Sequence, residues 1–103
     1  MNIDSELGQL IKSLRSLQNL TLHQVAKDTD IDMTMLSKIE RGERLPTFEQ
    51  VRKIAIFFQK DENELITKLT AEKIVKEYGI SEITLNAVQL VEEQIMNHLN
   101  KSK

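Results

Sequence analysis

The sequence contains no cysteine and no tryptophan, and among its 103 residues only one is proline and three are glycine. Without cysteine the chain can form neither a disulfide nor a thiolate-ligated zinc site, which fits a reducing cytoplasm. No apolar run approaches the roughly 18 residues of a membrane span, and residues 1–10 lack the apolar stretch of a secretion signal. So little proline and glycine leaves few turns. We therefore expect a mostly helical, cytoplasmic protein without a membrane partner.

Strong charge of one sign is also missing, since the formal net charge is −2. Residues 1–60 carry nine lysines and arginines against eight acidic residues, whereas residues 61–103 carry five against eight. This asymmetry indicates different roles for the two parts of the chain. Without a strongly basic surface, binding to DNA would need a few well-placed contacts and an oligomer.

Helix signals, by contrast, cover nearly the whole chain. The pairs Thr21 with Gln24 and Thr47 with Gln50 are capping boxes, and residues 5, 32, 61 and 81 are further expected starts. Gly42 and Gly79 are expected stops. The first helix, over residues 5–18, should turn one broad apolar face inward: Leu7, Leu10, Ile11, Leu14 and Leu17. We expect an all-α fold of five packed helices and a long sixth one, with a core that includes Leu14, Val25, Leu36, Ile39, Val51, Ile54 and Leu65.

Residues 21–42 form the most informative segment. Two short helices are joined there by a turn of about four residues, 28–31, and the small Ala26 lies where the helices must cross closely. This arrangement is typical of a helix-turn-helix, which presents its second helix to the major groove of DNA.

The segment resembles the phage-repressor/Cro-like (XRE) helix-turn-helix family, in register from about Leu7 to Leu69. The matching positions are Leu14-Arg15, Thr21-Leu22, Val25-Ala26, the run Leu-Ser-Lys-Ile-Glu-Arg-Gly at 36–42, Arg44, Pro46-Thr47 and Ile54-Ala55. Two positions depart from the pattern. Asp30 replaces the usual turn glycine, at a cost of about 1 kcal/mol for a positive φ, and Leu22 replaces a phosphate-contacting glutamine. The resemblance implies a lambda-repressor-like DNA-binding domain over residues 1–70 and a helical extension over 71–103.

On the third helix, a stripe opposite the buried face is a candidate for reading bases. The family's base-reading positions fall on Met33, Thr34 and Lys38, and Ser37 belongs to the same stripe. Lys38 could donate to guanine O6 and N7, while Met33 and Thr34 could meet a thymine methyl group. The expected phosphate contacts come from two helix N-termini, from a residue beside the first of them, and from the residues that flank Gly42 after the third helix. These residues are Thr21, His23, Arg41, Arg44 and Thr47.

Other charged residues carry no catalytic or metal-binding pattern. The resemblance implies a structural salt bridge between Arg15 and Glu40. Asp28, Asp30 and Asp32 imitate the start of a calcium loop, but the required glycine and the twelfth-position glutamate are absent. No nucleophile–base signature or phosphate-binding loop is present, so we expect no enzyme activity, no metal and no cofactor.

The extension carries an apolar seam at spacings of three and four residues, which favours pairing with another helix. Its members are Val88, Val91, Ile95 and Leu99, with Ala87 beside them. The alternative is that this seam packs on the preceding helix of its own chain.

These features predict a homodimeric DNA-binding regulator that represses its own operon from a palindromic operator in double-stranded DNA. Controller proteins of restriction–modification operons resemble the chain in size and domain plan and are the leading specific alternative. An alternative from another class is an antitoxin-type module, whose acidic C-terminal part binds a partner protein.

Overall fold

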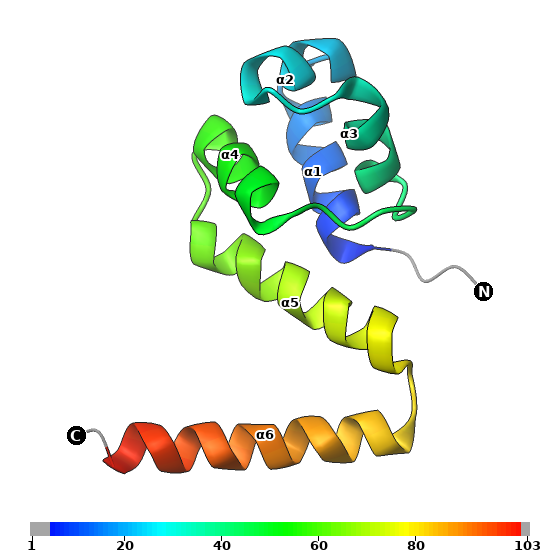
Figure 1. The fold of residues 1–103 in the computed structure, drawn as a ribbon. Coiled ribbons are helices and arrows are strands. Elements are labelled where there is room, and N and C mark those ends of the chain that lie inside the picture. The colour runs from blue at the N-terminus through cyan, green and yellow to red at the C-terminus, as the bar shows by residue number, and fades with distance from the viewer. Residues whose placement is uncertain (1–4, 102–103) are drawn as a thin grey trace. The chain divides into compact units, whose positions relative to one another are not determined.

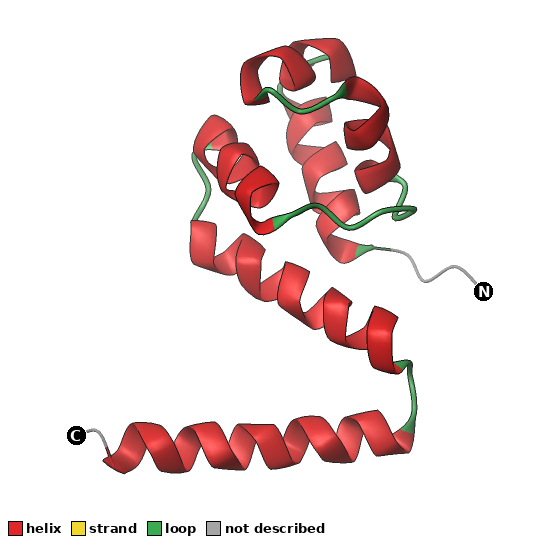
Figure 2. Cartoon of the chain, viewed as in Figure 1, coloured by secondary structure: helices red, strands yellow, loops and turns green. Residues whose placement is uncertain are grey.

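The computed structural model describes residues 5–101, which form six α-helices and no strand (Figures 1 and 2). The predicted all-α class is therefore confirmed. The helices are α1 (Glu6–Leu17), α2 (Leu22–Thr29), α3 (Met33–Glu40), α4 (Phe48–Phe58), α5 (Glu62–Tyr78) and α6 (Glu82–Lys101). The chain divides within α5 into a larger unit that ends at Lys73 and a smaller one that starts at Ile74.

The helix starts follow the capping chemistry of the sequence. Thr21 and Thr47 both form complete capping boxes, at the starts of α2 and α4. Asp32 caps α3 by accepting a hydrogen bond from the Met35 amide at 3.2 Å. The expected start at residue 61 is confirmed, since α5 begins at Glu62 and Asp61 accepts a hydrogen bond from the Asn63 amide at 3.3 Å.

Two side chains cap the start of α1, and one comes from far along the chain. Ser5 Oγ accepts from the Gly8 amide at 2.9 Å, and a carboxylate oxygen of Glu72 accepts from the Leu7 amide at 3.1 Å. A carboxylate is favourable there, because the free N–H groups of a helix start carry partial positive charge. Glu72 thus ties α5 to α1 across the larger unit.

The core of the larger unit is apolar and draws on α1 to α5. All seven of the expected core residues are buried, together with Leu7, Ile11, Ala26, Ile31, Ala55, Phe58 and Leu69. Leu17 is a correction, because its side chain is 80% exposed. It is the last residue of α1 and lies at the edge of the apolar face, about 80° from Leu7 at 100° per residue. Leu10 is only partly buried against the core.

Backbone conformations at two turns set the path of the chain around α3. Asp30 ends α2 in the left-handed region at φ 55°, as the departure from glycine required. Gly42 adopts φ 76° after α3. There the Glu43 amide donates to the Lys38 carbonyl at 2.9 Å and the Gly42 amide to the Ile39 carbonyl at 3.1 Å. This is a Schellman turn, and it needs a residue that tolerates positive φ.

The smaller unit consists of the end of α5, a turn and α6. Gly79 stops α5 at φ 85°, as expected. Ser81 Oγ accepts from the Thr84 amide at 3.2 Å at the start of α6. No residue of α6 is buried.

Candidate nucleic-acid interface

Helix α3 has one buried face and one open face. Leu36 and Ile39 are fully enclosed in the core, whereas Met33 is 47% exposed and Thr34 is exposed beside it. Ser37 and Lys38 are half-buried on the same side of the helix. The predicted base-reading stripe is therefore accessible. The opposite face of α3 is buried in the core and holds the helix in place.

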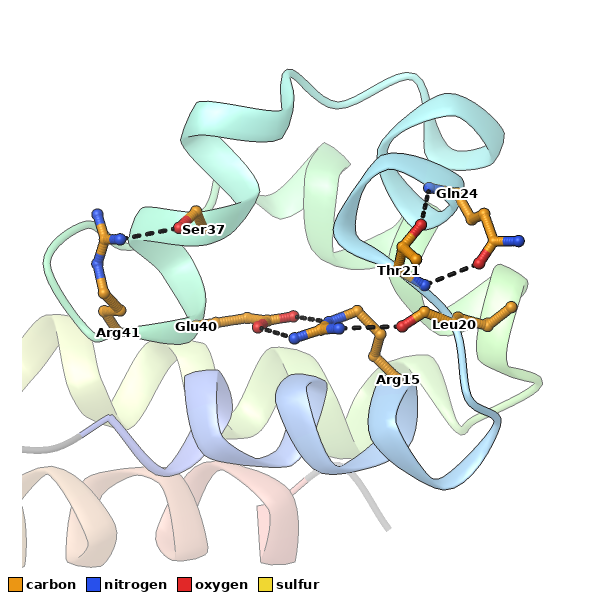
Figure 3. Close-up of polar contacts among 7 residues, drawn as sticks. All are labelled: Arg15, Leu20, Thr21, Gln24, Ser37, Glu40 and Arg41. Carbon is orange, nitrogen blue, oxygen red and sulfur yellow. Dashed lines mark hydrogen bonds and ion pairs between the residues drawn. The ribbon is translucent and has the colours of Figure 1, made fainter.

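Arg41 is held along this open face by two partners. Its Nη1 donates to Ser37 Oγ at 3.0 Å (Figure 3). Its Nη2 donates to a carboxylate oxygen of Glu43 at 3.0 Å. A guanidinium carries five N–H groups, so three stay free to meet an acceptor. The structure thus joins a predicted base-contacting residue, Ser37, to a predicted phosphate-contacting one, Arg41. Sequence reasoning missed Glu43, although its place one residue past Gly42 is where a Schellman turn folds the chain back.

Arg15 and Glu40 meet in a two-pronged ion pair that positions α3 on α1 (Figure 3). Arg15 Nε and Nη2 donate to the two carboxylate oxygens of Glu40 at 2.8 and 3.0 Å. Nη1 donates to the Leu20 carbonyl at 3.0 Å, just before α2. The side chains are 17% and 5% exposed, and the hydrogen bond to Glu40 raises the pKa of the Arg15 guanidinium. One side chain therefore fixes the end of α3 and the entry into α2.

The candidate phosphate contacts are all exposed. Thr21 accepts from the Gln24 amide at 3.1 Å while Gln24 accepts from the Thr21 amide at 2.8 Å, and Thr47 and Gln50 repeat this exchange at 3.1 and 3.0 Å. The capping side chains are thus engaged, but the exposed helix starts keep further N–H groups that can meet an anion. His23 and Arg44 also lie open to solvent.

Acidic residues surround the start of α3 without forming a metal site. Asp28, Asp30 and Asp32 are exposed, and Asp32 is engaged as the cap of α3. Within residues 5–101 no group of three or more His, Cys, Asp or Glu side chains could hold a metal ion. In the same range, no helix is both long and apolar enough to cross a membrane.

The seam expected on α6 is open to solvent along its length. The exposed fractions are 41% for Val88, 49% for Val91, 53% for Ile95 and 53% for Leu99. A continuous exposed apolar surface of this kind is typical of an interaction site.

Comparison with known proteins places this geometry in a family. Residues 11–65, which span α2, α3 and α4 whole, match the family model described as helix-turn-helix. The ImmF control region 10 kDa protein of Bacillus phage phi105 is 38% identical over 74 residues, which are 72% of this chain and 80% of that protein.

Two solved structures share the fold. The restriction–modification controller protein C.AhdI from Aeromonas hydrophila is 24% identical, with a TM-score of 0.55, over 59% of this chain and 92% of its own. The clp gene regulator ClgR from Corynebacterium glutamicum is 18% identical, with a TM-score of 0.56, over 95% of this chain and 90% of its own. With the site and these relatives together, the chain belongs to the helix-turn-helix family, as a DNA-binding transcriptional regulator of the phage-repressor/Cro-like (XRE) type and not an enzyme.

Proposed function

We propose that the protein is a homodimeric repressor that binds a palindromic operator, in the cytoplasm, and regulates its own operon. The observation that carries this proposal is the accessible stripe of α3. Its side chains lie on the face opposite Leu36 and Ile39, which are buried in the core. A rigid helix with one free face is what readout in the major groove requires. The likeness to a phage control-region protein and to a controller protein supports a regulatory role of this kind.

Each residue of the stripe takes a role set by its chemistry. Lys38 donates to guanine O6 and N7, and Met33 and Thr34 contact thymine methyl groups. Ser37 already accepts from Arg41, so its hydroxyl proton is free to donate to a base or a phosphate oxygen.

Phosphate contacts then set the register of α3 on the duplex. Arg41 and Arg44 contribute positive charge beyond the end of α3. The starts of α2 and α4, at Thr21 and Thr47, offer backbone N–H groups, and His23 lies beside the first of them. In this proposal residues 1–70 bind DNA.

Residues 71–103 pair two subunits through Val88, Val91, Ile95 and Leu99. A dimer would place two copies of α3 about 34 Å apart, which is one turn of the double helix and matches a palindromic site. The second subunit also doubles the number of phosphate contacts. This matters for a chain whose net charge is −2.

Selection of binding sites from random duplex DNA tests the readout. Lys38→Ala should lose preference at one or two positions and cost about 1–3 kcal/mol on the best site. Arg44→Ala should weaken all sequences alike, because a phosphate contact carries no sequence information. Lys60→Ala is the matched control, since Lys60 is exposed beyond the end of α4, opposite to the end that Thr47 caps.

An inverted repeat in the selected sequence supports the palindromic operator. If Lys38→Ala keeps both the selected motif and its affinity, the assignment of the base-reading stripe is wrong.

One observation favours a second candidate, an antitoxin-type module that binds another protein. The open apolar seam of α6 lies in a part of the chain where acidic residues outnumber basic ones. Co-purification separates the two, because this candidate predicts a stable complex of two different proteins, whereas the repressor predicts a homodimer.

A further inference from the structure

We infer that two copies of the chain pair through α6 in antiparallel orientation, with Val91 of each copy at the two-fold axis. The inference rests on the proposed homodimer and adds to it the direction and register of the pairing. Its starting point is a helix of 20 residues with no buried residue of its own, about 30 Å long at 1.5 Å per residue.

Five apolar residues of α6 lie on one face, whereas the exposed Leu85, Leu90 and Met96 lie about 100–140° from Val91. At 100° per residue, Ala87, Val91 and Ile95 lie within about 80° of one another along its centre, and Val88 and Leu99 lie at one side. Gln89 and Glu93 point the other way. A second copy of this chain is an occupant of matching length and chemistry, because each face then covers an identical apolar face.

The order of side-chain sizes favours the antiparallel register. With Val91 opposite Val91 of the second copy, Ala87 of each chain faces Ile95 of the other. A small residue then meets a large one in two symmetric layers, which fills space evenly. An in-register parallel pair would instead set Ala87 against Ala87 and leave a gap, and such gaps cost contacts.

The helix dipoles favour the same direction. Antiparallel helices place the positive end of each dipole beside the negative end of its neighbour, whereas parallel helices place like ends together. Glu82, in the first turn of α6, lies about 180° from Val91 and so points away from the pairing face.

Disulfide trapping tests the direction, and the absence of native cysteine gives it a clean background. Ala87→Cys and Ile95→Cys are made in the full chain, one of them tagged, and are oxidised singly and after co-expression. Facing positions approach closely enough for a disulfide. We expect the co-expressed pair to give a cross-linked dimer that contains one tagged and one untagged chain. Each variant oxidised alone should form no cross-link and should run as a single chain on a non-reducing gel.

Val91→Cys should cross-link with itself in either direction, so it reports that α6 pairs at all. Gln89→Cys, on the opposite face, is the matched control and should not cross-link. Self-linked Ala87→Cys and Ile95→Cys without a mixed product would overturn the antiparallel direction and leave the dimer intact.

Light scattering on the unmodified chain distinguishes failure of this inference from failure of the proposed homodimer. A dimer in which Val91→Cys fails to cross-link pairs through another surface, which overturns this inference but keeps the proposed homodimer. A monomer at all concentrations would overturn both.

Discussion

At the scale of single residues, the interface depends on side chains that hold other groups in place. Arg15 makes three hydrogen bonds, two to Glu40 and one to the Leu20 carbonyl, and both partners of its ion pair are largely buried. An ion pair in such surroundings is costly to break, because the charge left behind has lost its water and its partner. Neither side chain belongs to the open stripe of α3, yet together they set where that stripe lies.

A double-mutant cycle measures this pair. Glu40→Gln should lower the free energy of unfolding by about 3 kcal/mol, since the guanidinium of Arg15 stays buried without its counter-charge. The cycle is completed with Arg15→Met and the double variant, each measured by urea unfolding. The coupling free energy between the two residues should be above about 0.5 kcal/mol. The exposed pair of Arg52 and Glu62 is the matched control, and its coupling should stay below about 0.5 kcal/mol. Additive effects at Arg15 and Glu40 would show that their contact contributes nothing to stability.

The residues of the site differ in how far the sequence alone predicts them. The stripe on α3 follows from helical periodicity, because removing the buried Leu36 and Ile39 leaves the open positions. Glu43 and Glu72 could not be predicted in this way. Their partners, Arg41 and the Leu7 amide, are met only once a turn has folded back or two helices have packed. Glu72 carries no local signal of its contact, and Glu43 has only its place one residue past Gly42.

At the scale of elements, the crossing of α1 and α3 depends on the absence of one side chain. A Cβ atom at Gly8 would collide with the carbonyl oxygen of Ile39 and lie 3.0 Å from that of Glu40. Both are backbone atoms near the end of α3, so they cannot move aside as a flexible side chain would. Gly8 thus lets α1 lie against the same turn of α3 that Arg15 holds by its ion pair.

This contact predicts an unusual result for a glycine inside a helix. Gly→Ala in a helix interior ordinarily stabilises by about 1 kcal/mol, but Gly8→Ala should destabilise by about 1–3 kcal/mol through overpacking. Thermal unfolding measures the change. Ser13→Ala, at an exposed position of the same helix, is the control and should change stability by less than about 0.5 kcal/mol. A stabilised Gly8→Ala protein would mean that the two helices separate without cost.

Helix starts were the most predictable features at this scale, and helix contacts the least. The capping boxes at Thr21 and Thr47 are local, so four neighbouring residues suffice to recognise them. Leu17 shows the opposite case. Its apolar spacing fits the buried face of α1, yet its exposure depends on which helices lie near the end of α1, and periodicity carries no information about them.

At the scale of the whole molecule, the low net charge of the chain and the exposed apolar face of α6 are connected. A chain with a net charge of −2 has little general attraction for DNA, so its affinity must come from geometry and from the number of contacts. The proposed pairing of two subunits would supply that number, because two linked half-sites bind far more tightly than one. The seam of α6 would then determine DNA affinity without touching DNA.

Val91→Glu tests this link in the full chain. A charge at the centre of the seam opposes its burial, so the variant should be monomeric by light scattering while its helical content stays unchanged. Its affinity for the selected operator should fall by several kcal/mol. The salt dependence gives the sharper readout. The slope of log K against log salt scales at about 0.9 per phosphate contact, so a monomer on one half-site should show about half the slope of the dimer. Gln89→Glu adds the same charge on the opposite face of α6 and should leave mass, affinity and slope unchanged. If Val91→Glu stays dimeric and keeps the full slope, the subunits pair elsewhere, and the open face of α6 is left for a different protein.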